Sequence, residues 1–145
     1  VKSECFFCEY IKQNNDEKNL ILERDEFCFV IMNRYPYNNG HLMIVPYQHT
    51  GVLEQLEPEV RSAMMEKVTQ WQVLLKESLK AQGFNIGINI GHPAGAGVAD
   101  HIHIHIVPRW IGDTNFMPVL GETKVINQAL EELYHEFKRL FSDNT

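Results

Sequence analysis

Apolar side chains in residues 58–82 recur at spacings of three and four, the period of a helix with one buried face. Pro58 fits the first turn of this helix, and Gly83 fits the position just beyond its end. A short helix is also expected within residues 4–13, and the same period predicts a final amphipathic helix over residues 127–141. We therefore expect one long central helix with shorter helices near the two ends of the sequence.

Four other segments have the pattern of strands. Residues 27–32 and 42–45 are apolar runs joined by a turn-rich loop, which favours an antiparallel pair. Alternating apolar positions return at residues 84–90 and at residues 101–107. Because the long helix separates two pairs of strands, this order predicts a single α+β domain over residues 1–145 with a mostly antiparallel sheet.

Composition narrows the classes of partner. The 145 residues are 44% hydrophobic, which suits one globular domain. Thirteen Lys and Arg against 19 Asp and Glu give a net charge of −6, so we expect no nucleic-acid polymer as a partner. No apolar run approaches the roughly 18–20 residues of a membrane span. We expect no membrane partner and no signal peptide, and three sparse cysteines favour the cytoplasm.

Three histidines alternate with isoleucine from His101 through His103 to His105. In a strand they would share one face, about 6.5–7 Å apart, while the isoleucines pack on a core. Such rings could be hydrogen-bonded surface histidines, zinc ligands, or a catalytic row with one imidazole as nucleophile or base. Strict alternation of three titratable groups favours a functional site.

A glycine-rich loop, residues 91–100, runs into these histidines. Gly91, Gly95 and Gly97 allow the backbone to approach a ligand closely and to present N–H groups to an anion. Many such loops are simple turns. A loop able to hold phosphate directly before three histidines nevertheless indicates phosphoryl or nucleotidyl transfer.

The run His-Ile-His-Ile-His-Ile-Val-Pro at residues 101–108 resembles the signature of the histidine triad (HIT) superfamily of nucleotide hydrolases and transferases. The similarity extends to Asn33, to residues 40–46 and to Asn89, while residues 108–119 resemble the branch of fragile histidine triad proteins and microbial diadenosine tetraphosphate phosphorylases. The resemblance implies a HIT-like fold, with about five antiparallel strands, one long helix, shorter flanking helices and a C-terminal helix. It also implies a homodimer that pairs through the long helix and a strand.

The resemblance assigns roles to individual residues. His103 would attack the α-phosphorus of a nucleotide substrate such as diadenosine tetraphosphate, and water or inorganic phosphate would release the covalent nucleotidyl-histidine. His105 would hydrogen-bond the transferring phosphate, and His101 would fix the neighbouring geometry. The other nucleotide-binding positions are Asn33 at the ribose hydroxyls, His41 beside the triad, Asn89 at phosphate, and the N–H groups of Gly97 and Val98 around the developing charge.

The acceptor stays open. Many hydrolytic members carry Gln followed by Ser or Thr where this loop reads Gly97-Val98, so a hydroxyl near the phosphate is absent and phosphate is a credible acceptor. Two alternatives also stay open: hydrolysis of an adenosine phosphoramidate through the same nucleophile, and a nucleotide-binding module with little turnover.

Cys5 and Cys8 form a C-x-x-C pair, which by itself fits a metal site, a redox site or two reduced core thiols. By analogy with many microbial HIT proteins, they would bind a structural zinc together with His49 and His101. No organic cofactor is expected. Cys28 lies within an apolar strand pattern and predicts an inert core thiol.

Overall fold

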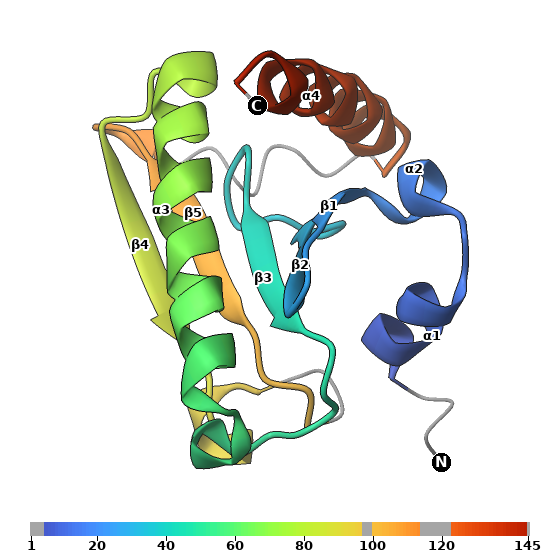
Figure 1. The fold of residues 1–145 in the computed structure, drawn as a ribbon. Helices are drawn as coiled ribbons and strands as arrows, with labels where there is room; N and C mark the ends of the chain where they lie inside the picture. Colours follow the sequence, from blue (N-terminus) through green and yellow to red (C-terminus); the bar gives the residue numbers. More distant parts are fainter. Residues whose placement is uncertain (1–4, 97–99, 114–122, 145) are drawn as a thin grey trace.

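The computed structural model describes residues 5–96, 100–113 and 123–144, with the backbone alone for residues 123–128. Five antiparallel strands form one sheet in the order β1-β2-β3-β5-β4 (Figure 1). The strands are β1 (Ile21–Arg24), β2 (Cys28–Met32), β3 (Leu42–Pro46), β4 (Gly83–Ile88) and β5 (Ile104–Arg109). The helices are α1 (Phe6–Lys12), α2 (Asp16–Asn19), α3 (Pro58–Leu79) and α4 (Thr123–Asp143), with short 3-10 turns at η2 (Leu53–Gln55) and η3 (His92–Ala94).

The expected α+β class is confirmed, with a five-stranded antiparallel sheet, one long helix and a C-terminal helix, but two short elements have no counterpart in the sequence prediction. The strand β1 pairs with β2 at the edge of the sheet, and α2 lies between α1 and β1. The strand spans four residues and the helix a single turn, so neither shows a full period of hydrophobic alternation.

The helices α3 and α4 cover one face of the sheet, and α1 lies on the other side of β1 and β2 (Figure 1). Trp71 of α3 is fully buried, and its indole Nε1 donates to Glu23 Oε1 at 2.9 Å. The helix ends at Leu79, earlier than residue 82, because Lys80 adopts a left-handed conformation at φ 54° and Gly83 instead begins β4.

The loop between β2 and β3 approaches the end of α3 closely at Gly40. This residue has φ +80°, and a Cβ there would lie 2.5 Å from Leu79 Cδ1. Glycine satisfies both constraints, since it has no Cβ and adopts positive φ freely. The loop is thereby held against the end of the helix, immediately before His41.

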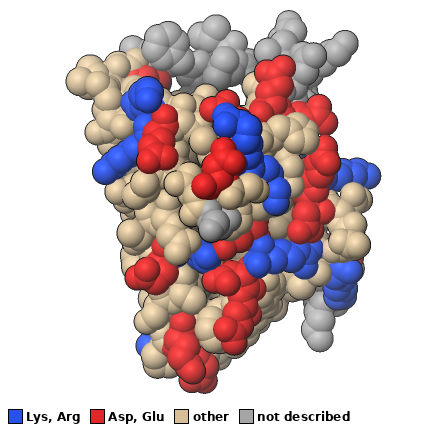
Figure 2. Space-filling view, turned by 45° about the horizontal axis from the view of Figure 1, so that its top comes forward, with Lys and Arg blue, Asp and Glu red and all other residues tan. Residues whose placement is uncertain are grey.

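Charged side chains of both signs are interspersed on the face shown in Figure 2, with no continuous basic surface there. This agrees with the net charge of −6 and gives that face no footprint for a polyanion. Within the described part of the chain, no helix combines the length and apolarity needed to cross a bilayer.

Candidate active site and metal centre

The alternation of histidine and isoleucine is realised in space. Ile102, Ile104 and Ile106 are buried in the core beneath α3, with exposed fractions of 3%, 5% and 0%. His101 and His103 lie on the opposite face, where the ring of Phe7 contacts both, at centroid distances of 5.4 and 5.2 Å.

The strand that carries the last histidine begins later than expected, at Ile104 rather than at residue 101. The segment before it is extended but is tied elsewhere, because the Ile102 N–H donates to the Thr50 carbonyl at 2.8 Å. His101 and His103 therefore lie in the extended segment that immediately precedes β5.

The hydrogen bond of His103 defines its chemical state. His103 Nδ1 lies 2.8 Å from the backbone carbonyl of His101, which can only accept, so Nδ1 carries the proton. Burial lowers the pKa of His103, which favours the neutral ring. Its Nε2 therefore keeps a lone pair, which is the form a nucleophilic imidazole requires.

Two successive hydrogen bonds, called the relay below, set the opposite tautomer in His105. The backbone N–H of Tyr37 donates to His41 Nδ1 at 3.1 Å, which places the proton of His41 on Nε2. His41 Nε2 then donates to His105 Nδ1 at 2.8 Å, leaving the proton of His105 on its own Nε2. With ring centroids 4.7 Å apart, His103 thus offers a lone pair beside a His105 that offers an N–H donor.

Both histidines of the relay, His41 and His105, are held in the neutral state. Burial, helped by the neighbouring imidazoles, lowers the pKa of His41 to about 3 and that of His105 to about 4. Each hydrogen bond of the relay contains one proton, and two neutral rings supply the donor and the acceptor that these bonds require. Near pH 7 His103 and His105 are accordingly both uncharged.

We expect acid to destabilise the protein through these two rings. Unfolded histidine protonates near pH 6.5, whereas folded His41 stays neutral down to about pH 3, so the unfolded state binds more protons between these values. The contribution is fully present above pH 6.5 and is lost as the pH falls. Each such ring adds about 1.4 kcal/mol per pH unit to the slope. Urea unfolding at several pH values between 7.5 and 4.5 measures it.

His41→Gln is the matched variant for this measurement. Its amide oxygen can accept from the Tyr37 N–H and its amide nitrogen can donate to His105, yet it does not titrate. We expect the slope to decrease by about one proton relative to wild type. Equal slopes in the two proteins would show that His41 is not held neutral.

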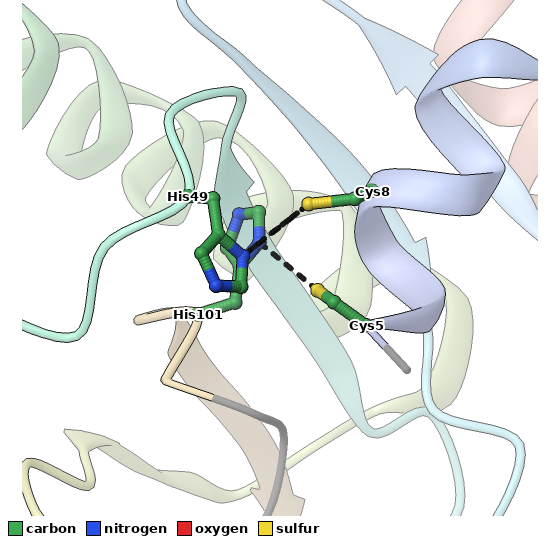
Figure 3. A group of neighbouring side chains, drawn as sticks. All are labelled: Cys5, Cys8, His49 and His101. Carbon is green, nitrogen blue, oxygen red and sulfur yellow. Dashed lines mark hydrogen bonds between the residues drawn. The ribbon is translucent and has the colours of Figure 1, made fainter. Parts of the chain in front are cut away.

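Four potential metal ligands converge from three parts of the chain (Figure 3). His101 Nδ1 lies 3.3 Å from Cys5 Sγ, 3.6 Å from Cys8 Sγ and 3.3 Å from His49 Nδ1. Cys8 Sγ and His49 Nδ1 are 3.3 Å apart, and all four atoms lie within 4.8 Å of one another. Ligand atoms around a tetrahedral zinc, at about 2.3 Å for sulfur and 2.0 Å for nitrogen, are about 3.3–3.8 Å apart. The spacing suits one tetrahedral ion.

The orientation of His101 supports the same conclusion. Its Nε2 lies 2.8 Å from the Pro46 carbonyl, to which it donates, so its Nδ1 is left with a lone pair facing the two thiols. Burial lowers the pKa of His101, which again favours the neutral, ligating form. Two thiols and two imidazoles are the donor types of a closed structural zinc site.

The helix that carries Cys8 is fastened to the sheet by Arg24 of β1. The guanidinium is 2.9 Å from the carboxylate of Asp16. It also donates to three carbonyls around the end of α1, those of Tyr10, Ile11 and Gln13. His101 is both a candidate ligand and the carbonyl acceptor for His103, so the candidate metal cluster is connected to His103 through one residue.

Asn33, the expected ribose contact, lies at the end of β2 beside His41. Its Nδ2 is 3.4 Å from both ring nitrogens of His41, and its Oδ1 accepts the Tyr35 N–H at 2.9 Å. The structure thus brings Asn33 to the same end of the sheet as the relay.

Asn89, the expected phosphate contact, follows β4 directly and points over the glycine-rich loop. Its Nδ2 lies 3.9 Å from where a Cβ of Gly95 would be, and Gly95 has φ +93°, a value suited to glycine. Gly97 and Val98, expected to donate N–H groups, lie outside the described residues.

Three contributors to the site were not assigned roles from the sequence. Tyr37 orients His41 through its N–H, Pro46 orients His101 through its carbonyl, and Phe7 packs against two histidines. Backbone groups carry no residue-specific signal, so the first two could not be found by motif. Phe7 could have been suspected from its position between the two cysteines.

Comparison with known families and relatives agrees with this geometry. A family model described as the HIT domain matches residues 13–110. The chain is 42% identical over 123 residues to AP-4-A phosphorylase of Mycobacterium tuberculosis, covering 84% of this chain and 63% of the relative. It therefore spans less than two thirds of that relative's length.

Solved structures share the fold. A Hit-like protein from Bartonella henselae has a TM-score of 0.75 at 20% identity, covering 94% of this chain and 96% of the other. A Zn-bound histidine triad family protein from Mycobacterium smegmatis has a TM-score of 0.68 at 28% identity, covering 92% of this chain and 97% of the other.

Proposed function

The chain belongs to the HIT domain family, and on that premise we propose that it is a nucleotidyl-transferring enzyme that cleaves dinucleoside polyphosphates, such as diadenosine tetraphosphate, at an α-phosphate. One observation carries the proposal: His103 offers a free lone pair directly beside an N–H donor on His105. The first group can attack phosphorus, and the second can hydrogen-bond the phosphoryl oxygen on which charge develops.

The reaction proceeds in two displacements. His103 Nε2 attacks the α-phosphorus, a P–N bond forms, and the P–O bond to the departing nucleoside polyphosphate breaks, with its electron pair leaving on oxygen. The imidazole becomes cationic, and the His101 carbonyl that accepts its Nδ1–H stabilises that charge. In the second displacement an acceptor oxygen attacks phosphorus and the P–N electron pair returns to His103.

Inorganic phosphate is the acceptor that we favour. The relative with 42% identity is named AP-4-A phosphorylase, and the loop of this chain lacks a hydroxyl at Gly97 and Val98. A hydroxyl near the phosphate is one way to orient an attacking water, so its absence weakens the case for hydrolysis.

Product analysis tests the acceptor. With diadenosine tetraphosphate we expect ADP and ATP, formed only when inorganic phosphate is present, because the adenylyl group passes from His103 to phosphate. Chromatographic separation of the nucleotides, with and without phosphate, measures this. AMP and ATP in both reactions would instead show hydrolysis. If neither reaction occurs, the proposal fails, and adenosine phosphoramidate cleavage or simple nucleotide binding takes its place.

We further propose that Cys5, Cys8, His49 and His101 bind one structural zinc ion. The support is the close approach of the four ligand atoms, all within 4.8 Å of one another, and the lone pair that the Pro46 contact leaves on His101. All four positions are filled by protein side chains, so a bound ion would order the segment around α1 and His101.

We also propose that the chain works as a homodimer in the cytoplasm. Support for pairing comes from β4, which is an edge strand of the sheet and exposes 41% of Ile86. Val73 and Met65 of α3 are also exposed, at 47% and 53%. Support for the location comes from the cysteines, because Cys5, Cys8 and Cys28 form no disulfide among the described residues.

A further inference from the structure

We propose that Tyr37 is a stacking platform for the second nucleobase of the substrate, that of the nucleoside on the departing polyphosphate. This inference rests on the proposed function and extends it. The structure places an exposed aromatic ring at the open end of the row of imidazoles, where no role is otherwise assigned to it.

The ring of Tyr37 covers the relay and is itself largely uncovered. Its centroid lies 4.9 Å from that of His41 and 6.1 Å from that of His105, with an interplanar angle of 27° to the latter. Yet 60% of the residue is exposed, whereas His41 beneath it is only 1% exposed. One face of the phenol thus rests on imidazoles, and the uncovered surface is available to another flat ring.

The backbone under Tyr37 is held on both sides. Its own N–H donates to His41, and the next residue, Asn38, donates from Nδ2 to the Pro108 carbonyl at 3.0 Å and to Asp113 Oδ2 at 2.7 Å. Arg109 in turn makes two 2.8 Å hydrogen bonds to Asp113. A ring carried by an anchored backbone loses little conformational freedom when a base stacks on it.

The order of the rings indicates which base this is. Phe7, His103, His105 and Tyr37 follow one another by successive contacts of 5.2, 4.7 and 6.1 Å. The transferred nucleotide bonds to His103, which is separated from Tyr37 by the ring of His105, while Tyr37 marks the exposed end of the row. The departing chain has to reach solvent, and its nucleobase can then meet Tyr37. Stacking of a base on an aromatic side chain contributes about 1–3 kcal/mol.

Two substrates isolate the second base. Diadenosine tetraphosphate and adenosine 5′-tetraphosphate carry the same transferred adenylyl group, but only the first has a nucleoside on the departing chain. We measure the ratio of their kcat/KM values, because any effect of a substitution on His41 or His105 is common to both substrates. For Tyr37→Leu we expect this ratio to fall about tenfold, mainly through the KM for the dinucleotide. Tyr37→Phe should keep the wild-type ratio.

Tyr35→Leu is the matched control. Tyr35 belongs to the same loop and is 80% exposed, but its ring makes no aromatic contact with the described residues. We expect the ratio to stay at its wild-type value in this variant. An unchanged kcat/KM ratio in Tyr37→Leu, or an equal fall of this ratio in both leucine variants, would contradict the proposal that Tyr37 stacks on the second base.

Binding separates this inference from the proposed function. If the wild-type protein cleaves neither compound, the proposed function fails, and the affinities of the two compounds are then compared by calorimetry. The platform still predicts tighter binding of the dinucleotide, and loss of that preference in Tyr37→Leu. Equal affinities in wild type would refute it.

Discussion

His103→Ala is expected to reduce turnover of diadenosine tetraphosphate by a factor of about 10⁴ or more, since removing a covalent nucleophile eliminates the reaction path itself. His105 keeps its donor after this substitution, because its tautomer is set by His41 and not by His103. Rapid quench with substrate labelled at the α-phosphate should show an acid-labile adenylyl-protein in wild type and none in the variant.

Two controls show that this loss is chemical. The variant should still bind nucleotide and metal, because His103 Nδ1 faces a backbone carbonyl and the residue is not among the four converging ligands. His135→Ala, on the exposed side of α4 where the ring lies 3.2 Å from the Glu17 carboxylate, should retain full activity. Normal turnover by His103→Ala would eliminate the nucleophile assignment, and loss of its metal would favour a site in which all the histidines serve metal.

Removing the metal is expected to have the largest effect on stability. Cys8→Ala or His49→Ala should lower bound zinc from one per chain to near zero, because each deletes one of the four converging ligands. Loss of a ligand present at a thousandfold its Kd costs about 4 kcal/mol of folding free energy. Metal analysis and thermal unfolding, with and without a chelator, measure both quantities.

Cys28→Ala is the control for this experiment. Cys28 is a fully buried thiol in the core between the sheet and the helices α3 and α4, as the sequence predicted, and burial raises its pKa to about 12. Its removal should leave zinc content unchanged. A wild-type protein that contains no stoichiometric zinc and whose melting is insensitive to chelator would refute the metal site.

Turnover should also fall when the metal is removed, although none of the four ligands is proposed to touch phosphorus. His101 connects the two sites, since its ring faces the cysteines while its carbonyl accepts the Nδ1–H of His103. Freeing the His101 ring therefore loosens the group that sets the tautomer of the nucleophile. We expect this loss to be partial, in contrast to that of His103→Ala.

Much of this molecule followed from local patterns. Apolar residues recur along α3 with the 3.6-residue period of a helix because one face of it is buried. Histidine and isoleucine alternate from His101 to His105 because side chains of extended backbone point to opposite faces in turn. Both periods are properties of the nearest few residues, so they could be read directly from the sequence. The order of the four predicted strands and the long helix followed in the same way.

Other features required the tertiary structure. The short strand β1 is stabilised by pairing with β2 and by contact with α4, and α2 packs on β1, so their own composition does not identify them. The resemblance to HIT proteins named the four metal ligands, but their convergence joins Cys5 to a residue 96 positions later.

The tautomers were also decided only in three dimensions. A proton on Nδ1 or Nε2 depends on which atom faces each ring, and here those atoms are the carbonyls of His101 and Pro46 and the N–H of Tyr37. The sequence by itself determined that three imidazoles share a face. The fold determined which of them holds a lone pair, which holds a donor and which faces the thiols, because hydrogen-bond geometry between backbone and ring exists only after the chain has packed.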